Sequence, residues 1–385
     1  MSSFDETNRQ SAEEIARQEA EQNRIAAEIA ELSQLGYQYL KENLLESAEE
    51  NFHKILEYEP ENNYALVGLG DSARKRGDYR AAIEYYQKCL EHHPDNNYAL
   101  FGLADCYKSL KHFNHAIKIW ERYLHHDDRN VTVLTRVADA YRKVKDFKRS
   151  EELYHRVLEM EEDNPYALIG LGHLNYDFKN YEQALHYWSR MYDKKGDQVD
   201  IRVLTSMGNC HRKMKTFADG VEYFEKALEK EPKNFYALFG LADCYRGLGD
   251  QEKSLTYWNR ILQKEPTNKV ILTRAGDAYR NMGDLEHAEE YYKAALNIEF
   301  DTYAILGLAL ISKQHGRYRE AIQSLESLVQ QDPKNHRLYM EIADCHLKLG
   351  DKSKALEVLS EVQKQGVRSR HVFEMAERIK HSVSS

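Results

Sequence analysis

An aspartate followed three residues later by an arginine or a lysine recurs along this chain. The pairs are Asp71/Arg74, Asp105/Lys108, Asp139/Arg142, Asp243/Arg246 and Asp277/Arg280. Side chains three residues apart are neighbours on a helix, and such an ion pair stabilises the helix by about 0.2–0.5 kcal/mol. The same guanidinium groups could instead hold the carboxylate of a ligand in a bidentate fork. The spacing alone leaves both roles open.

Residues that could act as nucleophiles or metal ligands form no recognisable constellation. The five cysteines include no CxxC spacing, and the adjacent histidines at 92–93 and 125–126 would point in different directions on a helix. His112 and His115 lack an evident third ligand. The motifs GxxxxGK[ST], HExxH and GxSxG are absent. We therefore expect no catalytic site, no metal site and no cofactor.

The composition narrows the choice of partner and compartment. The 385 residues include 54 Lys and Arg against 63 Asp and Glu, a formal net charge of −9. Phosphate backbones require surplus positive charge, so we do not expect a nucleic-acid partner. No apolar run is long enough for membrane insertion, and residues 1–6 do not read as a secretory signal. An odd number of cysteines without CxxC favours a reducing, cytoplasmic compartment.

A repeat of 34 residues organises most of the chain. The segment Tyr98–Tyr107 returns almost unchanged as Tyr236–Tyr245, and Pro60 and Pro94 lie 34 residues apart, as do Pro232 and Pro266. With this proline as position 32, ten units begin at residues 29, 63, 97, 131, 165, 201, 235, 269, 302 and 336. Position 4 is apolar or aromatic and position 8 is Gly or Ala in all ten units. Position 20 is small and position 24 is bulky, as in Ala116/Trp120, Ala184/Trp188, Ser254/Trp258 and Ala288/Tyr292. The fifth unit has 36 residues and the eighth has 33.

This pattern resembles the tetratricopeptide repeat (TPR) family, whose unit is a 34-residue helix-turn-helix. The resemblance covers residues 29–366 and implies an all-α fold, a right-handed superhelical α-solenoid of about ten units with a C-terminal capping helix. One helical hairpin cannot bury both of its apolar faces, so the neighbouring units must stack to stabilise one another.

The junctions between units carry helix-capping residues. The residue before each of the last nine units is Asn or Asp, a series of N-caps: Asn62, Asn96, Asn130, Asn164, Asp200, Asn234, Asn268, Asp301 and Asn335. Turns inside units read Gly-Asp at 77–78, 249–250, 283–284 and 350–351, where Gly suits a left-handed helix end and Asp can cap the next helix.

The two ends of the chain lie outside the array. Residues 1–28 are a charged, Ala-rich arm that could be a capping helix, a coiled-coil arm or a disordered tail, and we favour a partly ordered helix. Residues 367–385 contain an expected capping helix, from 369 to 381, and a short tail.

Alternate units match better than adjacent ones. Trp stands at position 24 only in units three, five and seven, as Trp120, Trp188 and Trp258. Two interpretations remain open, a duplication history alone or a recognition surface that repeats every second unit.

Positions 2, 5, 6, 9, 12 and 13 lie roughly 150° from the core stripe of the first helix. In the TPR family this is the concave face that receives peptides. Basic side chains outnumber acidic ones on this face, although the chain as a whole is acidic. The candidate binding residues are Tyr98, Phe101, Asp105, Lys108, Thr135, Arg136, Asp139, Arg142, Lys143, Tyr166, Arg212, Lys213, Tyr236, Phe239, Asp243, Arg246, Arg274, Asp277 and Arg280.

The function that follows is a non-enzymatic scaffold or adaptor. It would bind an extended or helical peptide, with an acidic or carboxylate-bearing segment, in the concave groove. Chaperone C-termini are poor candidates, since the family's Lys and Asn clamp at positions 5 and 9 is missing. The alternatives are a self-assembling structural subunit, for which self-association is possible, and a regulatory subunit docked on a partner enzyme.

Overall fold

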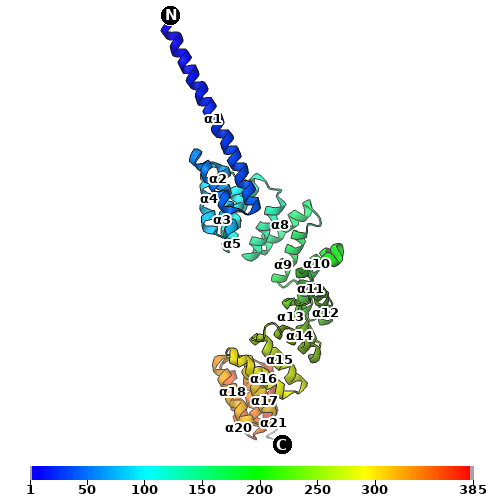
Figure 1. The fold of residues 1–385 in the computed structure, drawn as a ribbon. Coiled ribbons are helices and arrows are strands. Elements are labelled where there is room, and N and C mark those ends of the chain that lie inside the picture. Colours follow the sequence, from blue (N-terminus) through cyan, green and yellow to red (C-terminus); the bar gives the residue numbers. More distant parts are fainter. Residues whose placement is uncertain (1, 382–385) are drawn as a thin grey trace. The chain divides into compact units, whose positions relative to one another are not determined.

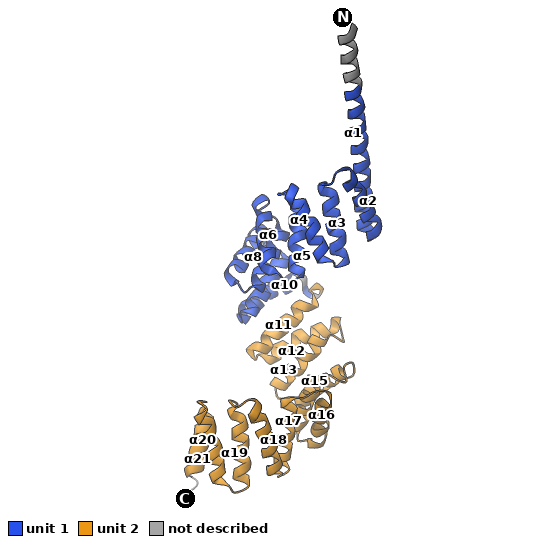
Figure 2. Cartoon of the chain, turned by 90° about the vertical axis from the view of Figure 1, so that its left-hand side faces the viewer, with its two compact units in different colours: residues 1–196 blue, residues 197–385 orange. Residues whose placement is uncertain are grey.

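The computed structural model describes residues 2–381, and this part of the chain consists of helices joined by short turns (Figure 1). It divides into two compact units, residues 1–196 and 197–385 (Figure 2). The boundary falls inside the longer fifth repeat, beside the short 3-10 helix Gly196–Gln198. The two units are described separately.

The N-terminal unit contains five helical pairs, each of which is one repeat. Its helices are α1 (Ser2–Glu42), α2 (Leu45–Tyr58), α3 (Asn63–Arg76), α4 (Tyr79–His92), α5 (Asn97–Ser109), α6 (Phe113–His126), α7 (Val131–Lys143), α8 (Phe147–Met160), α9 (Pro165–Asp177) and α10 (Tyr181–Lys195).

The C-terminal unit contains the other five pairs and one final helix. Its helices are α11 (Ile201–Met214), α12 (Phe217–Lys230), α13 (Phe235–Gly247), α14 (Gln251–Leu262), α15 (Lys269–Met282), α16 (Leu285–Ile298), α17 (Thr302–Gln314), α18 (Tyr318–Gln331), α19 (His336–Lys348), α20 (Lys352–Lys364) and α21 (Arg370–His381). The expected all-α solenoid of helix-turn-helix repeats is confirmed.

The predicted N-caps form in eight of the nine junctions. Asn96, for example, accepts a hydrogen bond from the backbone N–H of Ala99 at 2.9 Å. Asn335 is the exception, and for this residue the capping prediction is wrong. The N–H of Leu338 donates instead to the backbone carbonyl of Asn335 at 3.1 Å, a tighter first turn that occupies the donor a side-chain cap would use.

The turns inside the repeats use the left-handed conformation whether or not glycine is present. Gly77 and Gly249 have φ of 85° and 84°, as predicted for a helix C-terminus. Lys145 and Lys215 have φ of 64° and 65° at the corresponding turns, where a side chain costs free energy.

The core of each repeat is built from the large residue at position 24 and from small residues on the first helix of that repeat and of its neighbour. Trp120, Trp188 and Trp258 are buried at this position, as are Tyr86 and Tyr292. A Cβ built on Gly276, at position 8, would lie 2.8 Å from the Tyr292 ring, so only a residue as small as glycine fits there.

The ends of the chain extend the helical stack. Residues 2–42 form one continuous helix, so the arm and the first helix of the first repeat are a single element (Figure 1). Its side chains from 14 to 24 are exposed, whereas Ile29 and Leu40 join the core beside Phe52. At the other end, α21 buries Val372, Ala376 and Ile379 against α20 and α19.

Candidate functional site

The first helix of most repeats presents one polar and aromatic stripe, which we call the A-helix face and define by repeat positions 2, 5, 6, 9, 12 and 13. At positions 2, 5, 9 and 12, α5 carries Tyr98, Phe101, Asp105 and Lys108, and α13 carries Tyr236, Phe239, Asp243 and Arg246. The spacings of three, four and three residues place the four side chains on one side of a helix.

Tyrosines at position 2 are the most exposed large side chains of this face. Tyr98 is 79% exposed, Tyr166 72% and Tyr236 70%. Tyrosine offers an apolar ring with a polar tip and few rotatable bonds, which suits a protein-binding surface. All three rings are therefore open to solvent, and their part in binding a peptide stays a prediction.

In repeats with Tyr at position 24, that tyrosine supports the aspartate of its own repeat. The Tyr86 hydroxyl donates to Asp71 at 2.7 Å, and Arg74 donates to the same carboxylate at 2.8 Å. Burial, followed by the charge of Asp71, raises the pKa of Tyr86, so the hydroxyl stays protonated and can donate. These aspartates are thus anchored from beneath by a buried hydroxyl.

Asp139 and Asp277 are held by the same arrangement. The Tyr154 hydroxyl donates to Asp139 at 2.9 Å, and the Tyr292 hydroxyl donates to Asp277 at 2.7 Å. Arg280 lies 3.9 Å from Asp277 and donates to Tyr292 at 3.3 Å.

Arg142 lies between two carboxylates. It donates to Asp139 at 3.2 Å and to Asp177 at 2.6 Å, and its side chain is only 12% exposed. Two negative charges surround one positive charge, so this arginine contributes more to holding α7 and α9 together than to an open anion site.

The alternation along the chain has a packing cause. A Cβ built on Gly102 would overlap the Tyr86 ring, and one built on Gly240 would overlap the Phe224 ring. Tyr or Phe at position 24 therefore requires Gly at position 6 of the next repeat. After Trp120 and Trp258, position 6 is instead Arg136 and Arg274.

Each of these two arginines lies over the aromatic ring at position 5 of the preceding repeat. The Arg136 guanidinium is 4.8 Å from the Phe101 ring centre and also pairs with Asp105. The Arg274 guanidinium is 5.5 Å from the Phe239 ring and 5.8 Å from the Trp258 ring. Arginine is favoured over aromatic faces, and the ring holds the guanidinium in place.

Asp243 accepts hydrogen bonds from three arginines. Arg212 donates to it at 2.8 Å, Arg246 at 3.1 Å and Arg274 at 3.3 Å, while the aspartate is only 5% exposed. We call these four residues the Asp243 cluster. The three arginines belong to α11, α13 and α15, so the cluster joins three successive repeats.

The remaining predicted residues are less closely engaged. Lys143 and Lys213 are exposed near the ends of α7 and α11, and Lys108 is half-buried. The Thr135 hydroxyl donates back to the carbonyl of Val131 at 3.0 Å, so it is occupied by its own helix.

A hollow of about 820 Å³ opens on the A-helix face of the first repeats. It lies between α1, α3 and α5 and is lined by Ile29, Tyr37, Tyr64, Val67 and Tyr98 among others. The sequence did not single out Ile29 or Tyr37, because α1 was expected to change character near residue 28.

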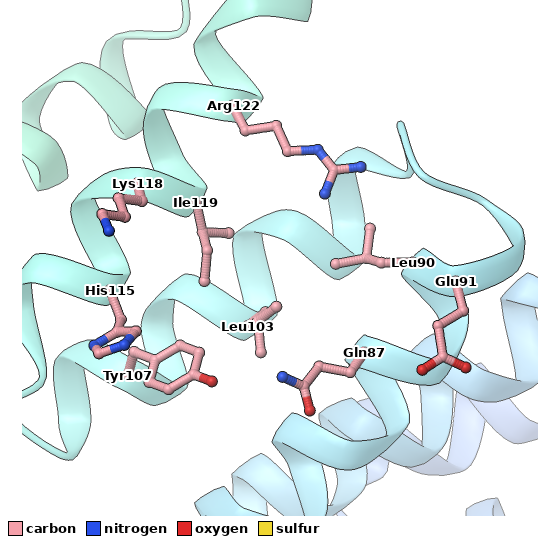
Figure 3. Close-up of a pocket in the computed structure, with 9 residues that line it drawn as sticks. All are labelled: Gln87, Leu90, Glu91, Leu103, Tyr107, His115, Lys118, Ile119 and Arg122. Carbon is pink, nitrogen blue, oxygen red and sulfur yellow. The ribbon is translucent and has the colours of Figure 1, made fainter.

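A second hollow lies among the helices α4, α5 and α6 (Figure 3). Here His115 stacks on Tyr107, with 5.3 Å between ring centres, and Arg122 and Glu91 lie at its rim (Figure 3). The mixed charges and open shape give it no clear preference for a ligand.

The cysteines are buried core residues, as predicted from their place in the repeat. Burial raises the pKa of Cys210 to about 12, and burial is also the main cause of the shift to about 12 at Cys106 and Cys244. A thiol held in its protonated form is a poor nucleophile. Among the side chains that the structure describes, no three metal-binding groups cluster, and no described helix has the length and apolar character to cross a membrane.

Comparison with known families agrees with the repeat. Tetratricopeptide repeat profiles match residues 33–88, 73–134, 136–199, 201–234, 223–256, 271–302 and 313–379. The chain belongs to the tetratricopeptide repeat family. Repeats of this family are generally protein-interaction modules, and the repeats of this chain support a protein–protein interaction scaffold.

Solved TPR structures are similar at low sequence identity. Pilf of Pseudomonas aeruginosa is 17% identical with a TM-score of 0.47, over 55% of this chain and 96% of that one. Yeast Tom70 is 15% identical with a TM-score of 0.42, over 92% and 96%. A TPR protein of Parabacteroides merdae is 18% identical with a TM-score of 0.40, over 71% and 94%. No curated protein matches the sequence.

Proposed function

We propose that this TPR protein is a non-enzymatic adaptor that binds an extended or helical peptide segment along the A-helix face. The observation that carries the proposal is an exposed tyrosine at position 2 in both units, Tyr98 and Tyr166 in the N-terminal unit and Tyr236 in the C-terminal unit. The helices of Tyr98 and Tyr236 also carry Lys108 and Arg246. Exposed rings contribute apolar contact area, and neighbouring cations favour acidic side chains in the ligand.

The electrostatics of the face support an acidic segment. Arg246 has a side chain that is 45% exposed, and Lys143 and Lys213 point charge toward solvent at helix ends. The chain's net charge of −9 therefore lies mostly elsewhere, so an acidic segment would be attracted to this face and repelled by the rest of the surface. The free, buried cysteines favour a reducing compartment, and we place the protein in the cytoplasm.

Panning a random library of twelve-residue peptides against the full-length chain tests this function. We expect enrichment of sequences with Asp or Glu and at least one apolar residue. Enrichment should be lost in the variant that carries Tyr98→Ser, Tyr166→Ser and Tyr236→Ser, because the ligand loses its ring contacts while the core is untouched.

The matched control is Phe373→Ser, which removes an aromatic residue of similar exposure from α21. This control should enrich the same peptides as the wild type. If the triple variant also enriches them, the A-helix face is not the binding surface.

A further inference from the structure

The Asp243 cluster differs from every other Asp and Arg pairing described on the A-helix face, because arginines from three helices converge on one carboxylate. Arg246 and Arg274 donate to Oδ1 of Asp243, and Arg212 donates to Oδ2. Three positive charges against one negative leave an excess of two in a partly buried place.

Two residues in the sixth repeat explain why Arg212 donates a hydrogen bond to an aspartate of the next repeat. In the second repeat, Arg74 at position 12 is held by Asp71 and by the Tyr86 hydroxyl of its own repeat. In the sixth repeat the corresponding residues are Asn209 and Phe224, which have no negative charge and no hydroxyl.

The side-chain contacts follow from this difference. Nε of Arg212 donates to the amide oxygen of Asn209 at 3.2 Å, and its Nη1 is left to donate to Asp243 at 2.8 Å in the next repeat. The aligned aspartate of the N-terminal unit, Asp105, pairs instead with Arg136, from the repeat that follows it.

The nearest charges do not neutralise the excess. Asp277 and Arg280, on α15, form a pair of their own with Tyr292. Lys213, beside Arg212, adds another positive charge near the same end of α11. The exposed part of Arg246 faces solvent, and Nε of Arg274 is buried without a hydrogen-bond partner among the described atoms.

The cluster lies on the same stripe as an exposed ring. Tyr236 precedes Asp243 by seven residues on α13, which is close to two full turns. A segment that lies on Tyr236 would therefore pass directly over the arginines.

We propose that the Asp243 cluster binds a phosphorylated side chain of the peptide segment. A phosphate carries a charge of about −1.5 to −2 and three acceptor oxygens, which match an excess of two charges and several guanidinium donors. A carboxylate would neutralise only half of that excess. This inference rests on the proposed peptide-binding function, to which it adds dependence on phosphorylation.

Three degenerate libraries of nine-residue peptides test it, with phosphoserine, glutamate or serine fixed at the centre. Each library is passed over the immobilised full-length protein, and the retained fraction is measured. The phosphoserine library should be retained about tenfold more than the glutamate library, the gain expected from one further charge-assisted hydrogen bond. Inorganic phosphate should compete for the retained peptides.

Asn209→Asp is the decisive variant, because it removes no arginine. Aspartate is the usual residue at this repeat position, so the fold accommodates it, and it gives Arg212 a carboxylate of its own. The preference for phosphoserine should then fall several-fold. Arg274→Gln should lower it as well, and Arg319→Gln, which removes an exposed arginine of α18 outside the A-helix face, should leave it unchanged.

Equal retention of the phosphoserine and glutamate libraries would overturn the proposal, as would a preference that survives Asn209→Asp. In either case the panned peptides of the previous section would still bind through the tyrosines, which separates this failure from a failure of the peptide-binding function itself.

Discussion

At the scale of single residues, repeat position 9 shows how one site serves different purposes. Most repeats place aspartate there, and buried tyrosines or neighbouring arginines hold it. The fifth repeat has His173 instead, whose ring meets the edge of Trp188 with 5.2 Å between centres. An imidazole in this place replaces a group that is negatively charged at neutral pH by one that gains a positive charge in acid.

His173 should make the protein less stable in mild acid. Burial, followed by the charge of Arg142, lowers the pKa of His173 below its ordinary value near 6.5, although Asp139 and Asp177 act in the opposite direction. Below that ordinary value the unfolded chain binds a proton that the folded chain does not, so the stability that is present above pH 6.5 is lost as the pH falls.

The measurement is the free energy of unfolding by urea at pH 7.5 and at pH 5.5. The loss between the two values should be smaller in His173→Gln than in the wild type. An identical loss in both proteins would show that His173 is protonated equally in the folded and unfolded states.

At the scale of helices, position 24 of one repeat and position 6 of the next act as a pair. Tyr86 and Phe224, at position 24, fill the space above Gly102 and Gly240 of the next repeat. Trp at position 24, as in Trp120 and Trp258, is instead followed by Arg136 and Arg274 at position 6. The two-repeat pattern is therefore a packing rule that also decides where arginines appear on the A-helix face.

Gly240→Ala should destabilise the protein by about 1–3 kcal/mol, because the added methyl group overlaps the Phe224 ring and forces it out of place. Phe224→Leu alone should also destabilise, since it leaves a cavity. The double variant should be less destabilised than the sum of the two, with a coupling measured by a double-mutant cycle.

The control is Ser206→Ala, at position 6 of the sixth repeat, where the preceding residue at position 24 is Trp188. Its effect should stay within about 0.5 kcal/mol. Additive effects of Gly240→Ala and Phe224→Leu would show that the two positions do not share one space.

The sequence was sufficient for the helices and for most of the local ion pairs, because caps and i,i+3 spacing act within one helix. Asn96, Gly77 and the Asp139/Arg142 pair are of this kind, whereas Asp105 pairs with Arg136 of the next repeat and not with Lys108. The Asp243 cluster was not foreseen as a unit. Its contacts join three helices and depend on the absence of a negative charge at Asn209, and rules that consider one helix at a time do not predict such contacts.

The same limit applies to α1 and to the hollow beside it. Composition changes near residue 28, but Ala and Glu are good helix formers, so nothing ends the helix until Asn43 with φ of 63°. The turn residues of the repeats predicted where helices end. Near residue 28 the sequence has no such helix-ending residue, so the arm continues directly into the first helix of the first repeat.

At the scale of the whole molecule, the chain consists of two compact units, and the boundary between them in the sequence falls within the fifth repeat. Repeat arrays are stabilised by contacts between neighbours, so their unfolding can lose cooperativity where those contacts change. The tryptophans report on the two units separately, since Trp120 and Trp188 belong to the first unit and Trp258 to the second. The handedness of the superhelix stays a prediction.

Destabilising one unit should therefore separate two unfolding transitions. In a chain with Trp120→Phe and Trp188→Phe, fluorescence reports only on Trp258, and Gly240→Ala should move that transition to a lower denaturant concentration. In a chain with Trp258→Phe, the same Gly240→Ala should move the transition of the first unit much less, because none of its core contacts involve that glycine. Equal shifts in both chains would mean that all ten repeats unfold as one cooperative body, and that the junction in the fifth repeat transmits stability as well as any other.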